Sequence, residues 1–218
     1  MRVYVGQTRS RALIAELTSL GFGEIVQRHE MVPRRLPYAL DNGAFGDWRA
    51  ERPFDALAFQ EAAHHAAYLD YGLGEAPDFI VTPDRVAGGL ESLRFSLTFV
   101  EWLYDLIPGV PIYLVTQDGM TESDVEPHLA PFGGIFVGGS LAWKVATGEG
   151  WVRFAHAHGL NCHIGRVGTA RRVAWALRIG ADSIDSCLPL WYRGNLDTFC
   201  RALEARQGDL FSSLEGAP

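Results

Sequence analysis

Short apolar runs rich in Val, Ile, Phe and Tyr recur eight times along this chain of 218 residues, and most are separated by stretches with helical periodicity. This alternation is typical of a parallel β/α architecture, so the sequence predicts an α/β fold. The predicted strands are 2–6, 24–28, 38–42, 78–84, 111–118, 133–138, 162–167 and 182–186. The predicted helices are 8–20, 54–72, 88–107, 121–130, 141–159, 169–180 and 195–206.

Eight strands in a chain of this length fit a small (β/α)8 barrel of TIM type, with an open doubly wound sheet as the alternative. One connection is irregular. About ten residues, Pro33 and Pro37 among them, join the second strand to the third and leave no room for a crossover helix. We find no internal repeat and no linker-like segment. The sequence therefore predicts one barrel domain over residues 1–208 and a flexible tail over 209–218.

The composition excludes several classes of protein. No apolar stretch approaches the ~18 residues of a membrane span, and the chain starts directly in a strand-like run, so we expect a cytoplasmic protein. Cys162, Cys187 and Cys200 have neither the number of a disulfide framework nor the spacing of zinc ligands, so we expect no metal and no cofactor. The net charge of −7 argues against tight, unspecific nucleic-acid binding. Lys144 is the only lysine, so the basic residues are almost all Arg.

Polar residues close the predicted strands from the third to the eighth. In a barrel the C-terminal strand ends meet at one mouth, where catalytic groups lie. Each residue alone is ordinary turn or capping chemistry, but this does not account for all of them together. We therefore predict a functional mouth. It comprises Asp41-Asn42-Gly43-Ala44-Phe45, Pro83-Asp84, Thr116-Gln117-Asp118, Gly138-Gly139-Ser140, Gly165-Arg166-Val167-Gly168-Thr169 and Asp185-Ser186.

Histidine and serine residues offer few alternatives at this mouth. His163 is predicted to pack in or near the barrel, and His64 and His65 lie on a predicted helix. No pair of histidines has the spacing of metal ligands. The serines near the strand ends have no evident His–Asp partners, so the sequence does not predict a serine nucleophile.

The strand-end series resembles the queuine and archaeosine tRNA-guanine transglycosylases. It is more similar to their short relatives, largely from phages, which insert 7-deazaguanines into DNA. The resemblance runs from residue 41 to residue 189, and the order and spacing of its motifs carry it. The most specific are Asp41-Asn42-Gly43-Ala44-Phe45, Val137-Gly138-Gly139, Gly165-Arg166-Val167-Gly168-Thr169 and Gly180-Ala181-Asp182-Ser183-Ile184-Asp185-Ser186.

The resemblance implies a pentosyltransferase with two catalytic carboxylates. Asp185 matches the family's nucleophilic aspartate, which attacks C1′ of the nucleotide as guanine leaves and holds the sugar as an ester. Asp41 matches the aspartate that acts as general acid and base. The chemistry is consistent with this, because exchanging one base for another with retention needs a nucleophile and a second group that manages protons.

The resemblance also implies a pocket that recognises the base. Phe45 matches the aromatic residue that stacks on it. Asp84 matches the acceptor for N1–H and the exocyclic amine of guanine, while Gln117 and the backbone of Gly138 and Gly139 match the groups that read the O6 edge. A carboxylate can accept the adjacent N–H groups of a purine, and the target base has to leave its stack to reach such a pocket.

Two departures from the tRNA enzymes favour DNA as the polymer. The chain lacks their C-terminal zinc subdomain, and the residues after Asp185 lack their arginine-bearing segment, for which only Arg193 is a replacement. The expected partners are therefore DNA in preference to tRNA, and a free 7-deazaguanine base, with no membrane. A homodimer is compatible with the sequence. A phage-encoded protein of this kind would act in the host cytoplasm.

Aromatic and basic residues supply candidate contacts to the polymer. Trp191 and Tyr192 are placed to cover the flipped nucleotide or to wedge the duplex, with ordinary packing as the alternative. Arginines are placed to bind phosphates around the mouth, with ordinary solvation as the alternative. They are Arg34, Arg35, Arg166, Arg171, Arg172 and Arg193.

Two other functions remain open from the residues alone. The segment 165–169 is also typical of a phosphate-binding loop in a barrel isomerase, synthase or aldolase that acts on a small phosphorylated metabolite. Asp185 argues against this function, because its carboxylate would repel the anion. The second alternative is a non-catalytic barrel that binds a nucleobase without cleaving a bond.

Overall fold

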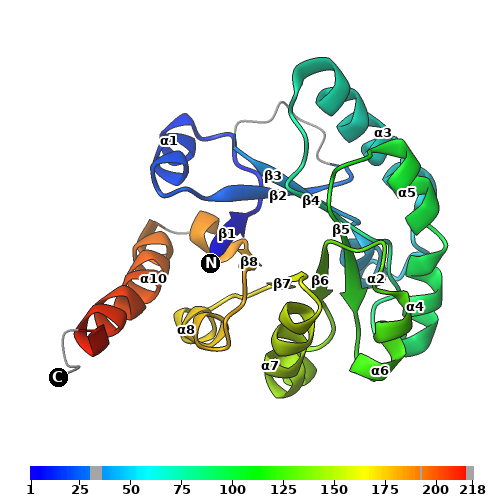
Figure 1. Cartoon of the computed structure of the whole chain (residues 1–218). Coiled ribbons are helices and arrows are strands. Elements are labelled where there is room, and N and C mark those ends of the chain that lie inside the picture. Colours follow the sequence, from blue (N-terminus) through cyan, green and yellow to red (C-terminus); the bar gives the residue numbers. More distant parts are fainter. Residues whose placement is uncertain (30–35, 192, 215–218) are drawn as a thin grey trace.

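The computed structural model describes residues 1–29, 36–191 and 193–214, where eight parallel strands close into a barrel (Figure 1). Strand order follows the chain, and β1 pairs with β8 to complete the ring. The strands are β1 (Arg2–Val5), β2 (Gly23–Gln27), β3 (Tyr38–Asp41), β4 (Phe79–Val81), β5 (Ile112–Thr116), β6 (Gly134–Val137), β7 (Asn161–Ile164) and β8 (Ser183–Ser186). The predicted barrel is confirmed, and the open-sheet alternative is wrong.

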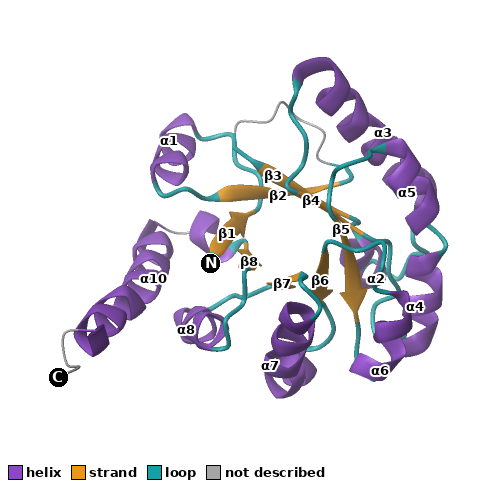
Figure 2. Cartoon of the chain, in the orientation of Figure 1, coloured by secondary structure: helices purple, strands orange, loops and turns teal. Residues whose placement is uncertain are grey.

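Helices surround the strands on the outside of the barrel (Figure 2). They are α1 (Arg11–Ser19), α2 (Ala44–Arg49), α3 (Ala56–Leu73), α4 (Gly89–Leu97), α5 (Val100–Leu106), α6 (Glu122–Val125), the 3₁₀ helix η1 (Glu126–His128), α7 (Leu141–Ala157), α8 (Ala170–Arg178), α9 (Leu188–Trp191) and α10 (Arg193–Leu214). The short helices α2 and α9 were not predicted. Helix α10 continues to Leu214, past the predicted domain boundary at 208, and residues 215–218 lie outside the described part.

The single helix predicted over 88–107 is wrong, because the segment forms α4 and α5 with a break between them. At the break, the amides of Thr98 and Phe99 bond to carbonyls three residues earlier, at Phe95 and Ser96. The Ser96 hydroxyl also donates to the Pro83 carbonyl at 2.7 Å, which fixes this turn to the loop after β4. Periodicity of apolar residues continues through such a break, so it does not reveal the kink.

The connection between β2 and β3 is short, and its described residues contain no helix. Residues 30–35, which include Pro33 and two of the arginines predicted to bind phosphate, lie outside the described part. The predicted irregularity of the barrel falls on this segment. Every other pair of successive strands is joined through at least one helix.

Aromatic rings fill the barrel interior beneath the mouth. Phe79 and Tyr113 stack with ring centroids 4.1 Å apart, and Tyr4 meets Phe79 edge to face at 5.4 Å. Gly23 and Gly134 make room for these rings, because a Cβ on Gly23 would lie 2.7 Å from the Tyr4 ring and one on Gly134 2.6 Å from the Tyr113 ring. The interior beneath the mouth is therefore a packed core, as in other barrels of this kind.

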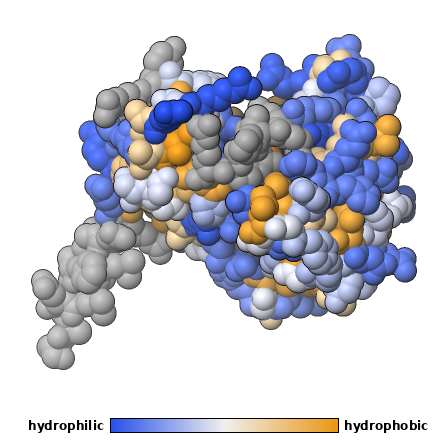
Figure 3. Space-filling model, turned by 90° about the horizontal axis from the view of Figure 1, so that it is seen from above, coloured by the Kyte–Doolittle hydropathy of each residue, from blue (hydrophilic) through white to orange (hydrophobic). Residues whose placement is uncertain are grey.

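The surface seen from above is mostly hydrophilic, with hydrophobic residues in small separate groups (Figure 3). No helix in the described residues combines the length and hydropathy needed to cross a membrane. Trp48 and Trp191 are large aromatic side chains that stay exposed, by 53% and 66%. Both lie beside cavities at the C-terminal end of the barrel.

Candidate active site

A cavity of about 400 Å³ opens at the C-terminal ends of the strands. This volume is within the range of small-molecule sites. Its lining includes every residue for which the sequence predicted a catalytic or base-binding role. These are Asp41, Phe45, Asp84, Gln117, Gly138, Gly139 and Asp185. Arg166 and Trp191, which were predicted to contact nucleic acid, line it as well.

Asp185 on β8 is buried and held by donors from β7 and the loop after it. Its Oδ2 accepts the backbone N–H of Arg166 at 2.8 Å and lies 3.1 Å from Nε2 of His163. Nδ1 of His163 lies 2.8 Å from the Ser183 hydroxyl, so the two ring nitrogens of His163 connect Ser183 with Asp185. Burial acts to raise the pKa of Asp185, but the contacts with His163 and Arg166 outweigh it and the pKa is lowered. Asp185 is therefore ionised at neutral pH.

Asp41, the last residue of β3, lies in the opposite electrostatic situation. Burial, together with the negative charges of Asp185 and Asp84, raises the pKa of Asp41 to about 7. At neutral pH this carboxyl group therefore exchanges between its acid and base forms, while Asp185 stays charged. Two carboxyl groups in one pocket with their pKa values pushed apart are the arrangement that assigns one to proton transfer and the other to nucleophilic attack.

Asp84 follows β4 and is oriented by two carboxamides. Asn42 donates through Nδ2 to Oδ1 of Asp84 at 2.7 Å, and Gln117 donates through Nε2 to Oδ2 at 2.5 Å. Burial nevertheless raises the pKa of Asp84 to about 6. Each carboxylate oxygen retains a further lone pair, so Asp84 can still accept two N–H groups from a ligand. Asn42 was predicted to lie at the mouth without a role of its own, and the structure shows that it positions Asp84.

Arg166 is an exposed residue that lines the pocket. Its backbone is left-handed, with φ at 57°. Its guanidinium lies 4.0 Å from the centroid of the Phe45 ring and donates to the Gly139 carbonyl at 2.6 Å. It also lies near enough to Asp84 to lower the pKa of that carboxyl group. A base that stacks on this face of Phe45 therefore has to displace the guanidinium.

Lys144 is a buried residue without a predicted role. It lies on α7 and donates from Nζ to the carbonyl of Gly165, the residue before the left-handed turn at Arg166. Burial lowers the pKa of Lys144 to about 8. The contact holds the backbone that presents the Arg166 N–H to Asp185. Its only sequence signal was that a chain rich in arginine keeps a single lysine.

The glycine pair after β6 is required by close packing. A Cβ on Gly138 would lie 2.9 Å from Nε2 of Gln117, and one on Gly139 would lie 2.6 Å from Oδ2 of Asp118. Gly139 also has a φ of +71°, which side chains rarely adopt. Asp118 accepts the N–H of Ser140 at 2.6 Å and its hydroxyl at 2.5 Å, so this carboxylate fixes the start of α7.

The predicted contacts to the polymer are only partly described. Trp191 is exposed at the edge of the pocket. Tyr192 lies outside the described residues, and of Arg193 the structure describes the backbone at the start of α10. Within the described part of the chain, no three His, Cys, Asp or Glu side chains are placed to hold a metal ion.

The fold and the pocket together define a (β/α)8 barrel with three acidic side chains and an arginine in one site at its mouth. A scan against protein-family models found none that matches the chain, and a search of curated proteins found no match either.

Proposed function

We propose that this protein is a base-exchange transglycosylase, which replaces guanine in a polynucleotide by a 7-deazaguanine through a covalent aspartyl–sugar intermediate. One observation carries the proposal: Asp41 and Asp185 share a pocket, and their pKa values are shifted in opposite directions. The resemblance of the strand-end motifs supplies the substrate class. The three carboxyl groups also disfavour the alternative of a phosphorylated metabolite, because they would repel its phosphate.

The first displacement uses both carboxyl groups. The ionised Asp185 attacks C1′ of the nucleotide, a bond forms from its oxygen to C1′, and the glycosidic bond to guanine breaks with its electron pair leaving on the base. Asp41 in its acid form gives that base a proton. In the second displacement the incoming deazaguanine loses a proton to Asp41 and attacks C1′. The ester to Asp185 breaks, and both side chains return to their starting states.

Recognition of guanine is assigned to the other wall of the pocket. Asp84, oriented by Asn42 and Gln117, accepts the two N–H groups on one edge of the base. The backbone at Gly138 and Gly139 lies beside Gln117, where it would meet the O6 edge. Phe45 offers its ring to the base once Arg166 has moved. The displaced guanidinium is then free to bind a phosphate of the polymer.

We expect exchange of labelled guanine into DNA to exceed exchange into tRNA at equal ionic strength. The physical reason is that the described residues form the barrel and its surrounding helices, and the candidate contacts to a polymer among them lie at the mouth. Because the net charge is −7, phosphate contacts have to be local. Binding should therefore weaken as salt rises, and the slope of the logarithm of the binding constant against the logarithm of salt concentration should correspond to roughly two to five released counterions. Labelling of tRNA alone would reject DNA as the polymer. Labelling of neither would reject the transglycosylase.

We expect release of guanine to fall as the pH rises through about 7. The step needs ionised Asp185, whose pKa is lowered, and protonated Asp41, whose pKa is raised to about 7. The rate of a single turnover without incoming base should be highest near pH 6 to 7, where the Asp84 carboxyl group that accepts from guanine is also ionised, and fall about tenfold per unit above 7. The variant Asp41→Asn should be slower and lack this fall. If the rate of guanine release by Asp41→Asn still fell with the same midpoint pH, the fall would belong to another titrating group, such as Lys144.

A further inference from the structure

A second cavity of about 430 Å³ lies beside the candidate active site, on the outer side of α2. Asp84 and Val86 line both cavities, so the two share a wall. The second cavity combines aromatic rings with arginines. Those of its lining residues that matter here are Trp48, Arg52, Phe54, Arg85 and Phe95. No role in the exchange reaction described above uses them.

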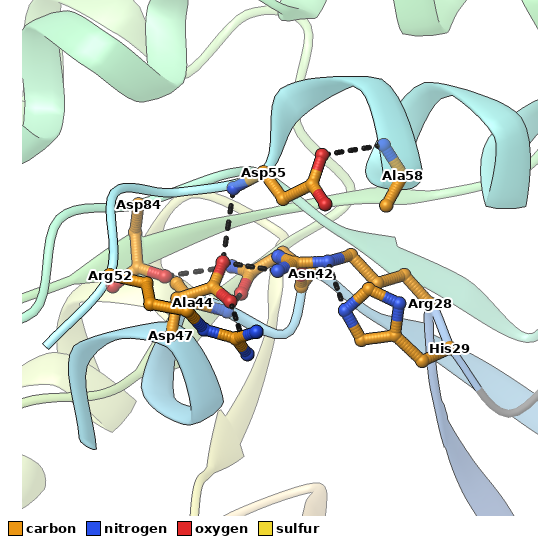
Figure 4. Close-up of polar contacts among 9 residues, drawn as sticks. All are labelled: Arg28, His29, Asn42, Ala44, Asp47, Arg52, Asp55, Ala58 and Asp84. Carbon is orange, nitrogen blue, oxygen red and sulfur yellow. Dashed lines mark hydrogen bonds and ion pairs between the residues drawn. The ribbon is translucent and has the colours of Figure 1, made fainter. Parts of the chain in front are cut away.

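Two arginines, Arg52 and Arg85, and two carboxylates, Asp47 and Asp84, line this cavity. Both carboxylates have partners elsewhere in the protein, because Asp84 accepts from Asn42 and Asp47 contacts Arg28 (Figure 4). The Asp47 carboxylate is paired with the buried Arg28, accepts the N–H of Asp55 at 3.0 Å and lies 3.4 Å from Arg52. Its charge is therefore compensated from within the protein. The Arg52 side chain is 65% exposed, and the exposed Arg85 lies over the Phe95 ring at 4.9 Å. Both arginines keep donors for an anion.

An aromatic surface connects the two cavities. Trp48 on α2 is half exposed, and its ring is stacked on Phe45 with centroids 5.7 Å apart and an interplanar angle of 27°. Phe45 lines the first cavity and Trp48 lines the second. A planar group that enters the second cavity can therefore stack beside Trp48 while another occupies the first. An exposed tryptophan next to arginines is the combination with which proteins bind unstacked bases of a single strand.

We infer that the second cavity binds the nucleotide next to the target guanine in the same strand. Its base stacks on Trp48, and its phosphate is bound by Arg52 and Arg85. The inference rests on the proposed function, which identifies the polymer and places the flipped guanine in the first cavity. Because the two cavities share a wall, the group that can reach the second cavity is one close to that guanine in the strand. The ligand of this site is thus a nucleotide unit within a polynucleotide, and not a free base.

Equilibrium binding of short single-stranded DNA, followed by fluorescence anisotropy, tests this site without depending on catalysis. The ligand is a seven-nucleotide strand with one central guanine, and two further strands each carry an abasic residue on one side of it. We expect one of these abasic strands to bind about tenfold more weakly to the unaltered protein. Trp48→Ala should weaken binding of the intact strand by a similar factor. Tyr71→Ala removes an aromatic near the end of α3 that is even more exposed, at 72% against 53% for Trp48, and should change nothing.

The combination of variant and abasic strand decides the result. If the missing base stacks on Trp48, Trp48→Ala should bind that abasic strand no more than about twofold more weakly than it binds the intact one. The inference would be overturned if the losses of affinity from Trp48→Ala and from the abasic residue multiplied to about 100-fold when combined. It would also be overturned if Trp48→Ala bound the intact strand as tightly as the unaltered protein does. Guanine exchange measured in parallel separates the two proposals. If the protein exchanges guanine but the two losses of affinity multiply, only the proposed role of the second cavity is rejected. If the two losses do not multiply but the protein exchanges no guanine, only the proposed transglycosylase activity is rejected.

Discussion

Asp185→Asn is expected to lower guanine exchange by at least about 10³-fold, equivalent to roughly 4 kcal/mol of transition-state stabilisation. The amide cannot form the ester with C1′, so the double displacement is lost at its first step. The substitution leaves an oxygen that still accepts the Arg166 N–H, so the loop after β7 should keep its conformation. Single-turnover release of labelled guanine measures the effect, with circular dichroism as the check on folding.

Asp182→Asn is the matched control, because it makes the same chemical change just before β8, at the opposite end of the barrel. Asp182 accepts the N–H of Cys162 at 2.7 Å, and an asparagine there keeps an acceptor. Exchange by this control should stay within about threefold of the unaltered protein. Equal losses of exchange in both variants would show that a disturbed β8, and not the loss of a nucleophile at Asp185, lowers the rate.

Arg28→Met should lower the free energy of unfolding by about 3 kcal/mol, the largest loss of stability we expect from a single change. The Arg28 guanidinium is fully buried, pairs with Asp47 and donates to the Asn42 carbonyl at 2.7 Å. Removing it leaves the buried Asp47 with Arg52, an exposed arginine at 3.4 Å, as its cationic partner. For a domain of this size the expected fall in melting temperature is roughly 6–12 °C.

Arg52→Met provides the comparison for this prediction. It removes the other arginine that faces the same carboxylate, but its side chain is 65% exposed and its contact with Asp47 is 3.4 Å long. An exposed pair of this kind contributes at most about 1 kcal/mol. Urea unfolding of both variants gives the two free energies. Equal losses, or a smaller loss for Arg28→Met, would contradict the assignment of Arg28 as the residue that holds α2 on the barrel.

The barrel could be predicted because its signal is local. Each strand is a short apolar run, and the helix between two strands has its own periodicity, so β5 and α7 are each visible without knowledge of their neighbours. The helices that were missed or merged depend on contacts between elements. The break after α4 depends on the Ser96 hydroxyl reaching the Pro83 carbonyl, and α2 begins where Asn42 accepts the Ala44 N–H.

The candidate site was only partly predictable for the same reason. Asp41, Asp84 and Asp185 were found because they lie at or near the C-terminal ends of strands, and these ends meet in a barrel. Their partners were not found, because each pairing exists only after the barrel closes. His163 reaches Asp185 across 22 positions of the chain, and Lys144 reaches Gly165 across 21. No spacing rule connects such pairs, so the proton states of the site could not be derived from the sequence.

The covalent intermediate is the central claim, and intact-mass spectrometry under denaturing conditions tests it most directly. The protein is incubated with a short guanine-containing DNA strand and no incoming base, so that the ester accumulates before its second displacement. We predict a species heavier than the protein by the mass of the strand less guanine, with the added mass on the peptide that contains Asp185, and no such species with Asp185→Asn. Guanine exchange without any adduct, or an adduct on another residue, would contradict the account.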